Sequence, residues 1–214
     1  LENNEIIRSN FIKNIKILTS KAEKNKTYTS EQEKEIFEYL EKNDPLLLLY
    51  IKFISFNFLR PVEVNRLLVK SINLKEKKLS VKTKTNKLKT KIIPDILLQE
   101  LPDLSQLNQD NYLFTPNGLG LEWVAEENNR RDSFSKRFKT VIKDHFNLGS
   151  EYGLYSFRHT FITKLYRNLR ENKSPHETKG ILMNITGHVT MDALEKYLRD
   201  IDAELPEDYS NLFR

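Results

Sequence analysis

Four short stretches of the chain carry residues whose types and spacing could do chemistry. Arg60 lies in FLRPVEVNRLL and Arg158 in YSFRHTFITKL, while GHVTMDALEKY contains His188 near its start and Tyr197 at its end. The fourth stretch, KTKTNKLKTKIIP, is rich in lysine. Two arginines can hold the non-bridging oxygens of a phosphodiester with charged, bidentate hydrogen bonds. A tyrosine can attack the phosphorus, and a lysine or histidine can transfer the protons that such a reaction moves.

Each of these side chains also has an ordinary structural interpretation. Arg60 could cap a helix, Arg158 could pair with a surface carboxylate, and His188 could cap a helix end. Tyr197 could pack its ring and expose its hydroxyl, as tyrosines on amphipathic helices commonly do. For any one residue alone the ordinary interpretation is favoured, and it is the conjunction of all four that favours catalysis.

Helical periodicity and capping signals predict the elements that would carry these residues. Ser30 to Glu33 form a capping-box pattern before an amphipathic helix, and Ser174 to Glu177 form a second such start. β-branched residues and turn signals over 71–94 predict short strands in a small meander, whereas NYLFTPNG predicts a loop. The fold class is therefore mainly α with a small antiparallel β-sheet (α+β). The other predicted helices span about 45–58, 61–69, 94–101, 131–146, 156–170, 175–185 and 190–199.

The composition excludes several classes of protein. There is no cysteine, which excludes disulfides, thiolate metal sites and cysteine nucleophiles. Four histidines without HExxH-like spacing give no reason to expect a metal, and no cofactor is expected. The apolar run over 45–59 is interrupted by Lys52 and Asn57 and is shorter than the ~20 residues of a bilayer span, so we predict a buried core helix and no membrane.

The charge and the ends of the chain add further expectations. The net charge of +5 is local, because residues 75–91 contain eight lysines and one acid and so carry +7, which leaves −2 elsewhere. A local cationic patch suits a phosphate backbone, although a solvated hairpin tip is an equally good interpretation of this feature alone. The first residues lack a secretory signal, and the absence of an initiator Met indicates a fragment of a longer protein.

In this order the four stretches resemble the catalytic domain of the tyrosine recombinases, the phage-integrase family. The family carries an LR-x-x-E segment, which is matched here by Leu59, Arg60 and Glu63. A lysine on a β-hairpin follows in the family, and the lysine-rich stretch stands at that place. The resemblance covers roughly residues 27–200.

The second half of the resemblance contains one departure. The family's H-x-x-R-H segment is matched by residues 155–159, but Tyr155 stands where the family has its first histidine. The family's GH is Gly187-His188, and its tyrosine nine residues after that histidine is Tyr197. A phenol has a reference pKa near ~10, so a tyrosine at the departing position is a poor proton acceptor.

The resemblance implies a role for each matched residue. Arg60 and Arg158 would hold the phosphate, and Tyr197 would attack it to form a 3′-phosphotyrosyl link and release a 5′-hydroxyl. His188 would hydrogen-bond the phosphate or assist the tyrosine, and Lys84 would protonate the leaving oxygen. Lys82 and Lys87 are close alternatives to Lys84.

Further residues are expected to support this set. Glu63 would orient Arg60, His159 would act from outside the reacting atoms, and Tyr155 is a candidate catalytic residue. The lysines expected to bind DNA are Lys82, Lys87, Lys89 and Lys91.

The preferred function is site-specific recombination of double-stranded DNA, as in the integration or excision of a mobile element. A type IB topoisomerase-like enzyme, an inactive DNA-binding regulatory module of the same fold and a helical scaffold with a basic loop are the alternatives. The resemblance implies a monomer when free, a homotetramer on DNA, accessory DNA-bending proteins and a cytoplasmic location on DNA.

The resemblance also suggests a division of the chain. Residues 1–27 would be the end of an upstream region or a linker, and 28–200 the catalytic domain. The tail 201–214 ends in Tyr209, Leu212 and Phe213, apolar groups that could dock onto a neighbouring protomer.

Overall fold

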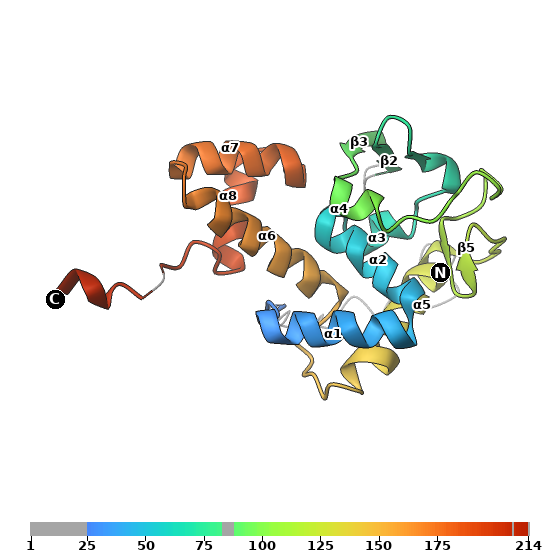
Figure 1. Cartoon of the computed structure of the whole chain (residues 1–214), viewed down its shortest axis with the longest axis horizontal. Coiled ribbons are helices and arrows are strands. Elements are labelled where there is room, and N and C mark those ends of the chain that lie inside the picture. Colours follow the sequence, from blue (N-terminus) through green and yellow to red (C-terminus); the bar gives the residue numbers. More distant parts are fainter. Residues whose placement is uncertain (1–24, 83–87, 207, 214) are drawn as a thin grey trace, which may run out of the picture.

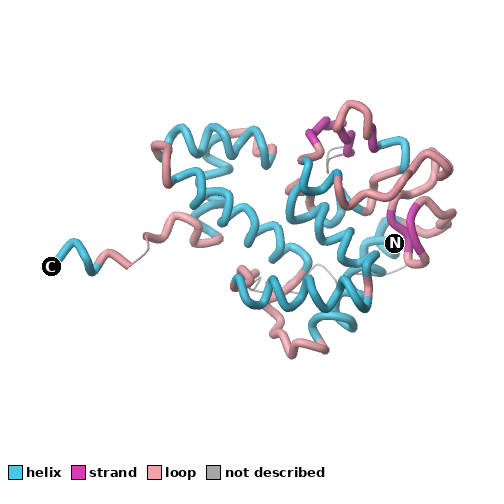
Figure 2. Tube along the Cα trace, in the orientation of Figure 1, coloured by secondary structure: helices cyan, strands magenta, loops and turns pink. Residues whose placement is uncertain are grey.

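The computed structural model describes residues 25–82, 88–206 and 208–213, and helices dominate this part of the chain (Figure 1). Figure 2 shows the strands gathered on one side of the molecule. The expected class, mainly α with small antiparallel sheets, is confirmed. The helices are α1 (Ser30–Asn43), α2 (Pro45–Phe56), α3 (Pro61–Val64), α4 (Asp95–Leu98), α5 (Glu127–Phe138), α6 (Leu154–Arg170), α7 (Pro175–Thr186) and α8 (Met191–Asp200), with 3₁₀ turns at Val69–Ser71 and Ser210–Phe213.

The capping box that starts α1 lies one residue earlier than predicted. The Thr29 hydroxyl accepts a hydrogen bond from Gln32 N at 3.2 Å, and Gln32 Oε1 accepts one from Thr29 N at 3.0 Å. Ser30 is therefore the first helical residue and not the cap. The prediction from Ser30 and Glu33 was wrong by one position because Thr29 and Gln32 offer the same pair of side-chain types at the same spacing.

The apolar run forms α2, which packs against α1, α4, α5 and α6. Its buried side chains lie on all faces, which confirms the predicted core helix. Asp44 caps its start by accepting a hydrogen bond from Leu47 N at 3.0 Å. The helix ends at Phe56, two residues before the predicted end, and Phe58 beyond it has a left-handed φ of 52°. Among the described residues, no helix is long and apolar enough to span a bilayer.

A three-stranded antiparallel sheet in chain order confirms the predicted meander. It contains β1 (Ile72–Asn73), β2 (Lys78–Lys82) and β3 (Leu88–Ile92), while residues 83–87 of the predicted meander lie outside the described residues. Strand β3 places its lysines inward, because Lys89 pairs with the buried Val81 and Lys91 pairs with the buried Leu79. Directly opposite residues of antiparallel strands project to the same face. Lys89 and Lys91 consequently share the covered face of the sheet.

Some predicted boundaries differ from the structure. The helix expected over 61–69 ends at Val64, and the loop expected at NYLFTPNG contains a hairpin of β4 (Phe114–Thr115) and β5 (Gly118–Leu119). The helix expected from 131 begins at Glu127 and continues as a π-helical turn over Lys139–Lys143. The last three helices agree with the prediction to within two residues at each end.

Two hydrophobic clusters build the core, and α6 joins them (Figure 1). Phe157, in the first turn of α6, packs in the cluster formed with α1, α2, α5 and the sheet. Ile162 and Tyr166, further along α6, pack in a second cluster with α7 and α8. Between these levels α6 buries Arg158 and His159, at 1% and 7% exposure, together with Thr160. The candidate site therefore lies where the two clusters meet.

Candidate active site

The turn between α2 and α3 presents Arg60. Leu59 is buried in the first cluster and Phe58 in the second, which fixes the backbone on the N-terminal side of Arg60. The buried Glu63 carboxylate then accepts hydrogen bonds from Arg60 N at 2.8 Å and from Arg60 Nη1 at 3.1 Å. Burial works against the charge of Arg60, but Glu63 and Tyr155 outweigh it and raise the arginine pKa above its ordinary value. Arg60 is thus an oriented and permanently charged group.

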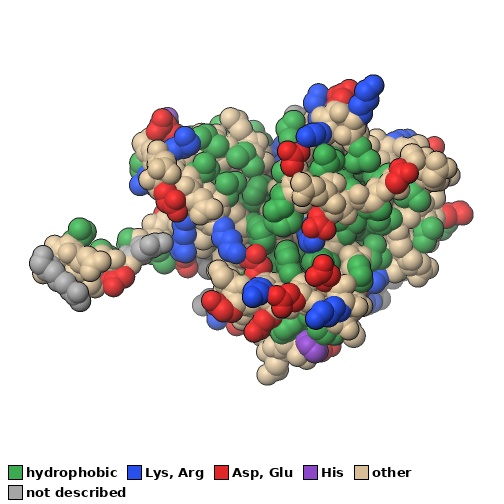
Figure 3. Space-filling model, in the orientation of Figure 1, with side chains coloured by type: hydrophobic (Ala, Val, Ile, Leu, Met, Phe, Trp, Pro, Cys, Tyr) green, Lys and Arg blue, Asp and Glu red, His purple; other side chains and the backbone are tan. Residues whose placement is uncertain are grey.

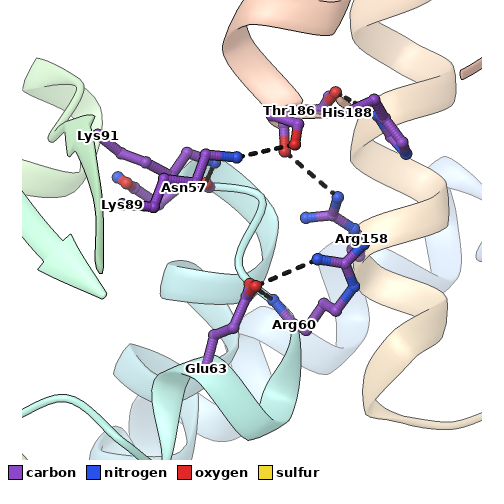
Figure 4. A network of polar contacts seen from close by, with 9 residues as sticks. Asn57, Arg60, Glu63, Lys89, Lys91, Arg158, Thr186 and His188 are labelled. Atoms are coloured by element: carbon purple, nitrogen blue, oxygen red, sulfur yellow. Dashed lines mark hydrogen bonds and ion pairs between the residues drawn. The ribbon is translucent and has the colours of Figure 1, made fainter. Parts of the chain in front are cut away.

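Arg158 presents a second guanidinium from inside the molecule. Its Nη2 donates to Thr186 O at 3.5 Å, while its Nε and Nη1 have no hydrogen-bond partner among the described residues. Burying a charged group with unused donors is costly unless a partner of opposite charge is supplied. Figure 4 shows the guanidinium groups of Arg158 and Arg60 pointing into the same space. This arrangement offers charged donors that an anion could use.

The inward-facing lysines of β3 extend the cationic cluster. Lys89 Nζ donates to Gly187 O at 2.8 Å, and Lys91 Nζ donates to Asn57 O at 2.5 Å (Figure 4). Burial, together with nearby arginines, lowers the pKa of Lys89 below its ordinary value. Burial, Arg158 and Lys89 lower the pKa of Lys91 to about 6. Both lysines are therefore half-buried beside the arginines instead of lying in solvent.

His188 follows directly after the end of α7. Gly187 ends that helix with a left-handed φ of 77°, which glycine adopts without strain. The His188 Nδ1 lies 2.6 Å from Thr186 Oγ1, and that hydroxyl donates its single proton to Leu182 O at 2.8 Å. With the hydroxyl proton so used, Nδ1 of His188 is the donor in this pair. Burial and the surrounding cations, Arg158 first, lower the pKa of His188 to about 4.

Helix α8 presents Tyr197 to two histidines. Its hydroxyl oxygen lies 2.8 Å from His159 Nδ1, and its ring centroid lies 5.0 Å from that of His188. Thr190 starts α8 by accepting a hydrogen bond from Ala193 N, so the helix begins directly after the His188 turn. Burial raises the pKa of the Tyr197 phenol above its ordinary value, and the Arg158 charge opposes this.

Tyr155 and His159 lie one turn apart on α6. Their rings meet edge to face with centroids 4.7 Å apart. Tyr155 also helps to raise the pKa of Arg60, so it borders the arginine as well as the histidine. Burial and the neighbouring Arg158 lower the pKa of His159 to about 4. His159, expected to act from outside the reacting atoms, instead contacts the tyrosine hydroxyl directly.

The structure thus brings most of the predicted site residues together. One of the exceptions is Lys82, which is exposed at the end of β2. Lys84 and Lys87 lie outside the described residues. Within the described residues, no three His, Asp or Glu side chains converge as metal ligands. The residues that converge are Arg60, Glu63, Lys89, Lys91, Tyr155, Arg158, His159, His188 and Tyr197.

Sequence reasoning missed two residues that organise the site. Thr186 holds Arg158 through its carbonyl and His188 through its hydroxyl. Asn57 accepts from Lys91 and donates from Nδ2 to Ile92 O at 2.9 Å, which ties β3 to the end of α2. Only the position of Thr186 next to the Gly-His pair could have signalled its role. Nothing in the sequence around Asn57 distinguishes it from a helix-ending polar residue.

The helical fold and this cluster of side chains define a tyrosine recombinase catalytic domain. The chain belongs to the phage integrase family, whose family model matches residues 26–203. No curated protein sequence matches the chain.

Solved structures share the fold at low sequence identity. The XerA recombinase is 14% identical with a TM-score of 0.59, over 92% of this chain and 64% of that one. The Tn1549 transposon integrase, solved with a circular intermediate DNA, is 14% identical with a TM-score of 0.61, over 92% and 66%. The catalytic domain of bacteriophage HP1 integrase is 15% identical with a TM-score of 0.53, over 85% and 91%. The chain therefore spans about two thirds of the two longer proteins and most of the isolated catalytic domain.

Proposed function

We propose that the protein is a site-specific DNA recombinase that cleaves and rejoins strands through a 3′-phosphotyrosine intermediate. The observation that carries the proposal is the buried guanidinium of Arg158 with two unpartnered nitrogens, next to Arg60 and Tyr197. A DNA phosphate supplies both the negative charge and the acceptor oxygens that these donors lack. The Tn1549 integrase and XerH structures were solved with their DNA, and this supports double-stranded DNA as the substrate.

The proposed reaction uses each member of the cluster at a stated atom. Arg60 and Arg158 hold the non-bridging oxygens and stabilise the charge that gathers there during attack. Tyr197 Oη bonds to phosphorus, and the bond from phosphorus to the 5′ oxygen breaks. The phosphotyrosine keeps the energy of the phosphodiester, so a 5′-hydroxyl from another duplex can reverse the step without an external energy source. His188 Nε2, on the side of the ring away from Thr186, contacts the phosphate.

The leaving 5′ oxygen needs a proton, and a hairpin lysine supplies it. Lys84 is the proposed donor, and Lys89 and Lys91 are the proposed phosphate ligands. Alanine variants of the three separate these roles. A substrate with sulfur in place of the leaving 5′ oxygen needs no proton donor, because a thiol is far more acidic than an alcohol. The sulfur substrate should restore cleavage in Lys84→Ala and leave any defect of Lys89→Ala and Lys91→Ala in place.

A nicked suicide duplex tests the proposed function. It carries the recombination site from the ends of the encoding element. After cleavage the short fragment that carries the new 5′-hydroxyl diffuses away, so the covalent adduct accumulates. The unaltered protein should give a DNA-linked band on a denaturing gel, and Tyr197→Phe should give none. Tyr209→Phe, in the exposed tail, is the matched control and should cleave normally.

The outcomes distinguish the alternatives. An adduct that persists in Tyr197→Phe contradicts the proposed nucleophile. DNA binding without an adduct in any variant would indicate an inactive DNA-binding module. Rejoining of the same strand without exchange between duplexes would indicate topoisomerase-like activity.

We also propose that the tail docks onto a second copy of the chain in a DNA-bound tetramer. Ile201 and Ala203 are buried in the second cluster, so the segment that projects from the body begins at about Leu205 (Figure 1). Leu212 and Phe213 are 83% and 80% exposed. They match an apolar groove of about 840 Å³ between β3–α4 and α6–α7, where Figure 3 shows hydrophobic side chains gathered.

Removing residues 205–214 tests the docking without disturbing the core. Synapsis of two duplexes should weaken while cleavage of a single duplex remains. Ile92→Ser, which changes an exposed residue of the groove, should reproduce the defect, whereas Val124→Ser, an exposed residue elsewhere, should not. Unchanged synapsis in the truncated chain contradicts the docking.

A further inference from the structure

His159 makes a direct polar contact with the proposed nucleophile, Tyr197. Its Nδ1 lies 2.8 Å from Tyr197 Oη, and the two ring centroids are 5.3 Å apart at an interplanar angle of 31°. A nitrogen at this distance either accepts the phenolic proton or donates to the phenolic oxygen. A neutral imidazole that accepts at Nδ1 can remove that proton during attack, which is the geometry required of a general base.

The neighbouring groups are less suited to take this proton. The Nδ1 of His188 is already paired with Thr186, and this pair orients the ring for the phosphate. Tyr155 contributes a phenol ring that packs edge-on against His159. Tyr155 thus limits the rotation of the imidazole and keeps Nδ1 directed at Tyr197.

The charge environment keeps His159 in the form that accepts a proton. His159 is only 7% exposed, and burial together with Arg158 lowers its pKa to about 4. The imidazole is therefore neutral near pH 7 before DNA binds. A phosphate at the arginines adds negative charge close to the ring and favours the imidazolium that forms during attack. Arg158 and His159 are adjacent on α6, so one turn of helix holds both the phosphate ligand and the base.

We propose that His159 is the proton acceptor for Tyr197 in DNA cleavage, which rests on the proposed recombinase function. The phenolic proton passes to His159 Nδ1 as the Tyr197 oxygen forms its bond to phosphorus. The electron pair of the broken bond stays on the 5′ oxygen, which takes a proton from the hairpin lysine. In rejoining, the incoming 5′-hydroxyl gives its proton to that lysine, and the His159 imidazolium returns a proton to the leaving phenolate.

The first test compares adduct formation in His159→Gln and His159→Ala with the unaltered protein on the nicked suicide duplex. General-base catalysis typically contributes ~10²–10⁴-fold, so the initial rate should fall by about 100-fold or more. Circular dichroism and DNA binding by each variant establish that the fold and the phosphate contacts are intact. His145→Gln, on an exposed histidine that stacks on Tyr39 and is not a member of the cluster, is the matched control and should keep the full rate.

Two further measurements separate proton transfer from a purely structural role. Replacing Tyr197 by a trifluorinated tyrosine makes the phenol more acidic. In that background His159→Gln should lower the rate of adduct formation by less than about tenfold. The sulfur-substituted substrate should leave the His159→Gln defect unchanged, because the defect lies in the nucleophile and not in the leaving group.

Each result decides the proposal. A His159→Gln rate within about threefold of the unaltered protein overturns it, as does a defect that the sulfur substrate repairs. A defect that the fluorinated tyrosine does not reduce shows that His159 acts only by packing and also overturns it. An unaltered protein that forms no adduct at all overturns the proposed function as well, which distinguishes the two failures.

Discussion

Replacing Lys91 by methionine is expected to stabilise the folded protein and to impair its reaction. Lys91 lies on the covered face of the sheet, with Arg158 and Lys89 nearby, and its pKa in the folded state is about 6. Methionine keeps a similar length of unbranched chain and removes the amine. The change therefore tests directly whether the site holds a desolvated amine that its fold does not need.

The magnitude follows from the change in pKa on folding. An unfolded lysine has a pKa near 10.5, so at pH 7 the folded protein holds Lys91 mostly neutral at a cost of about 5 kcal/mol, at ~1.36 kcal/mol per pH unit. Removing the amine avoids this cost, but the variant also loses the hydrogen bond to Asn57 O, which lowers the free energy of unfolding by about 1–3 kcal/mol. The expected increase in the free energy of unfolding is about 2–4 kcal/mol at pH 7.

The same difference between the folded and unfolded pKa of Lys91 determines how the free energy of unfolding depends on pH. Between about pH 6 and pH 10.5 the unfolded chain binds a proton at Lys91 that the folded chain does not bind, so the unaltered protein becomes more stable as pH rises. The advantage of Lys91→Met should be full below about pH 6 and should fall as pH rises, reaching zero between about pH 8 and pH 10, where the lost hydrogen bond cancels what remains of it.

Urea unfolding followed by circular dichroism at pH 6, 7.5 and 9 measures this advantage. Lys82→Met, on the exposed end of β2, is the matched control and should change stability by less than about 0.5 kcal/mol. A Lys91→Met protein that is no more stable than the unaltered one, or whose gain does not shrink as pH rises, would refute the reasoning. Adduct formation should fall in the same variant, because the phosphate that restores the charge of Lys91 would lose a ligand.

Other predictions follow from the contacts around the site. Thr186→Val removes the hydroxyl that orients His188 and should slow adduct formation on suicide substrates about tenfold. DNA binding, measured by gel shift, should change little. An unchanged rate of adduct formation contradicts the orienting role of the hydroxyl. Gly187→Ala should lower the free energy of unfolding by about 1–2 kcal/mol in thermal melts, because a Cβ strains the left-handed backbone and meets Lys89 Nζ. Gly187→Asn should lower it less, because asparagine tolerates the left-handed conformation better than alanine does. Equal losses of stability in the two variants would contradict the role of the left-handed backbone. Acidification from about pH 6.5 to pH 4 should lower the free energy of unfolding, because unfolded histidines bind protons in that range while folded His159 and His188, with pKa values of about 4, do not. Changing both histidines to glutamine should weaken this dependence of the free energy of unfolding on pH, as urea titrations would measure. An unchanged pH dependence would contradict the buried neutral state of the two histidines.

The sequence could predict most helices and the grouping of the principal side chains. The Ser174 start of α7 and the helix expected over 131–146 rest on local signals, namely capping and periodicity, and the structure is helical at both places. The order of Arg60, Arg158 and the Gly-His segment was visible because each sits in a short motif. The roles of the residues in the cluster remain predictions that the experiments above test.

The parts that could not be predicted depend on pairing across the fold. The alternation of residues in LKTKI gives β3 two faces but does not say which face is covered by the rest of the protein. The usual expectation that polar residues face solvent would have placed the lysines on the exposed face. The pairing with Leu79 and Val81 decides the opposite orientation. The contact between His159 and Tyr197 likewise depends on how α8 packs against α6, which no local spacing specifies.

The central claim is tested most directly by identifying the residue that becomes joined to DNA. The adduct from the suicide duplex is digested with protease and nuclease, and mass spectrometry locates the nucleotide on the peptide. We expect a single modified residue, Tyr197, carrying a 3′-phosphate-linked nucleotide. A nucleotide on any other residue, or a 5′-phosphate linkage at Tyr197, would contradict it.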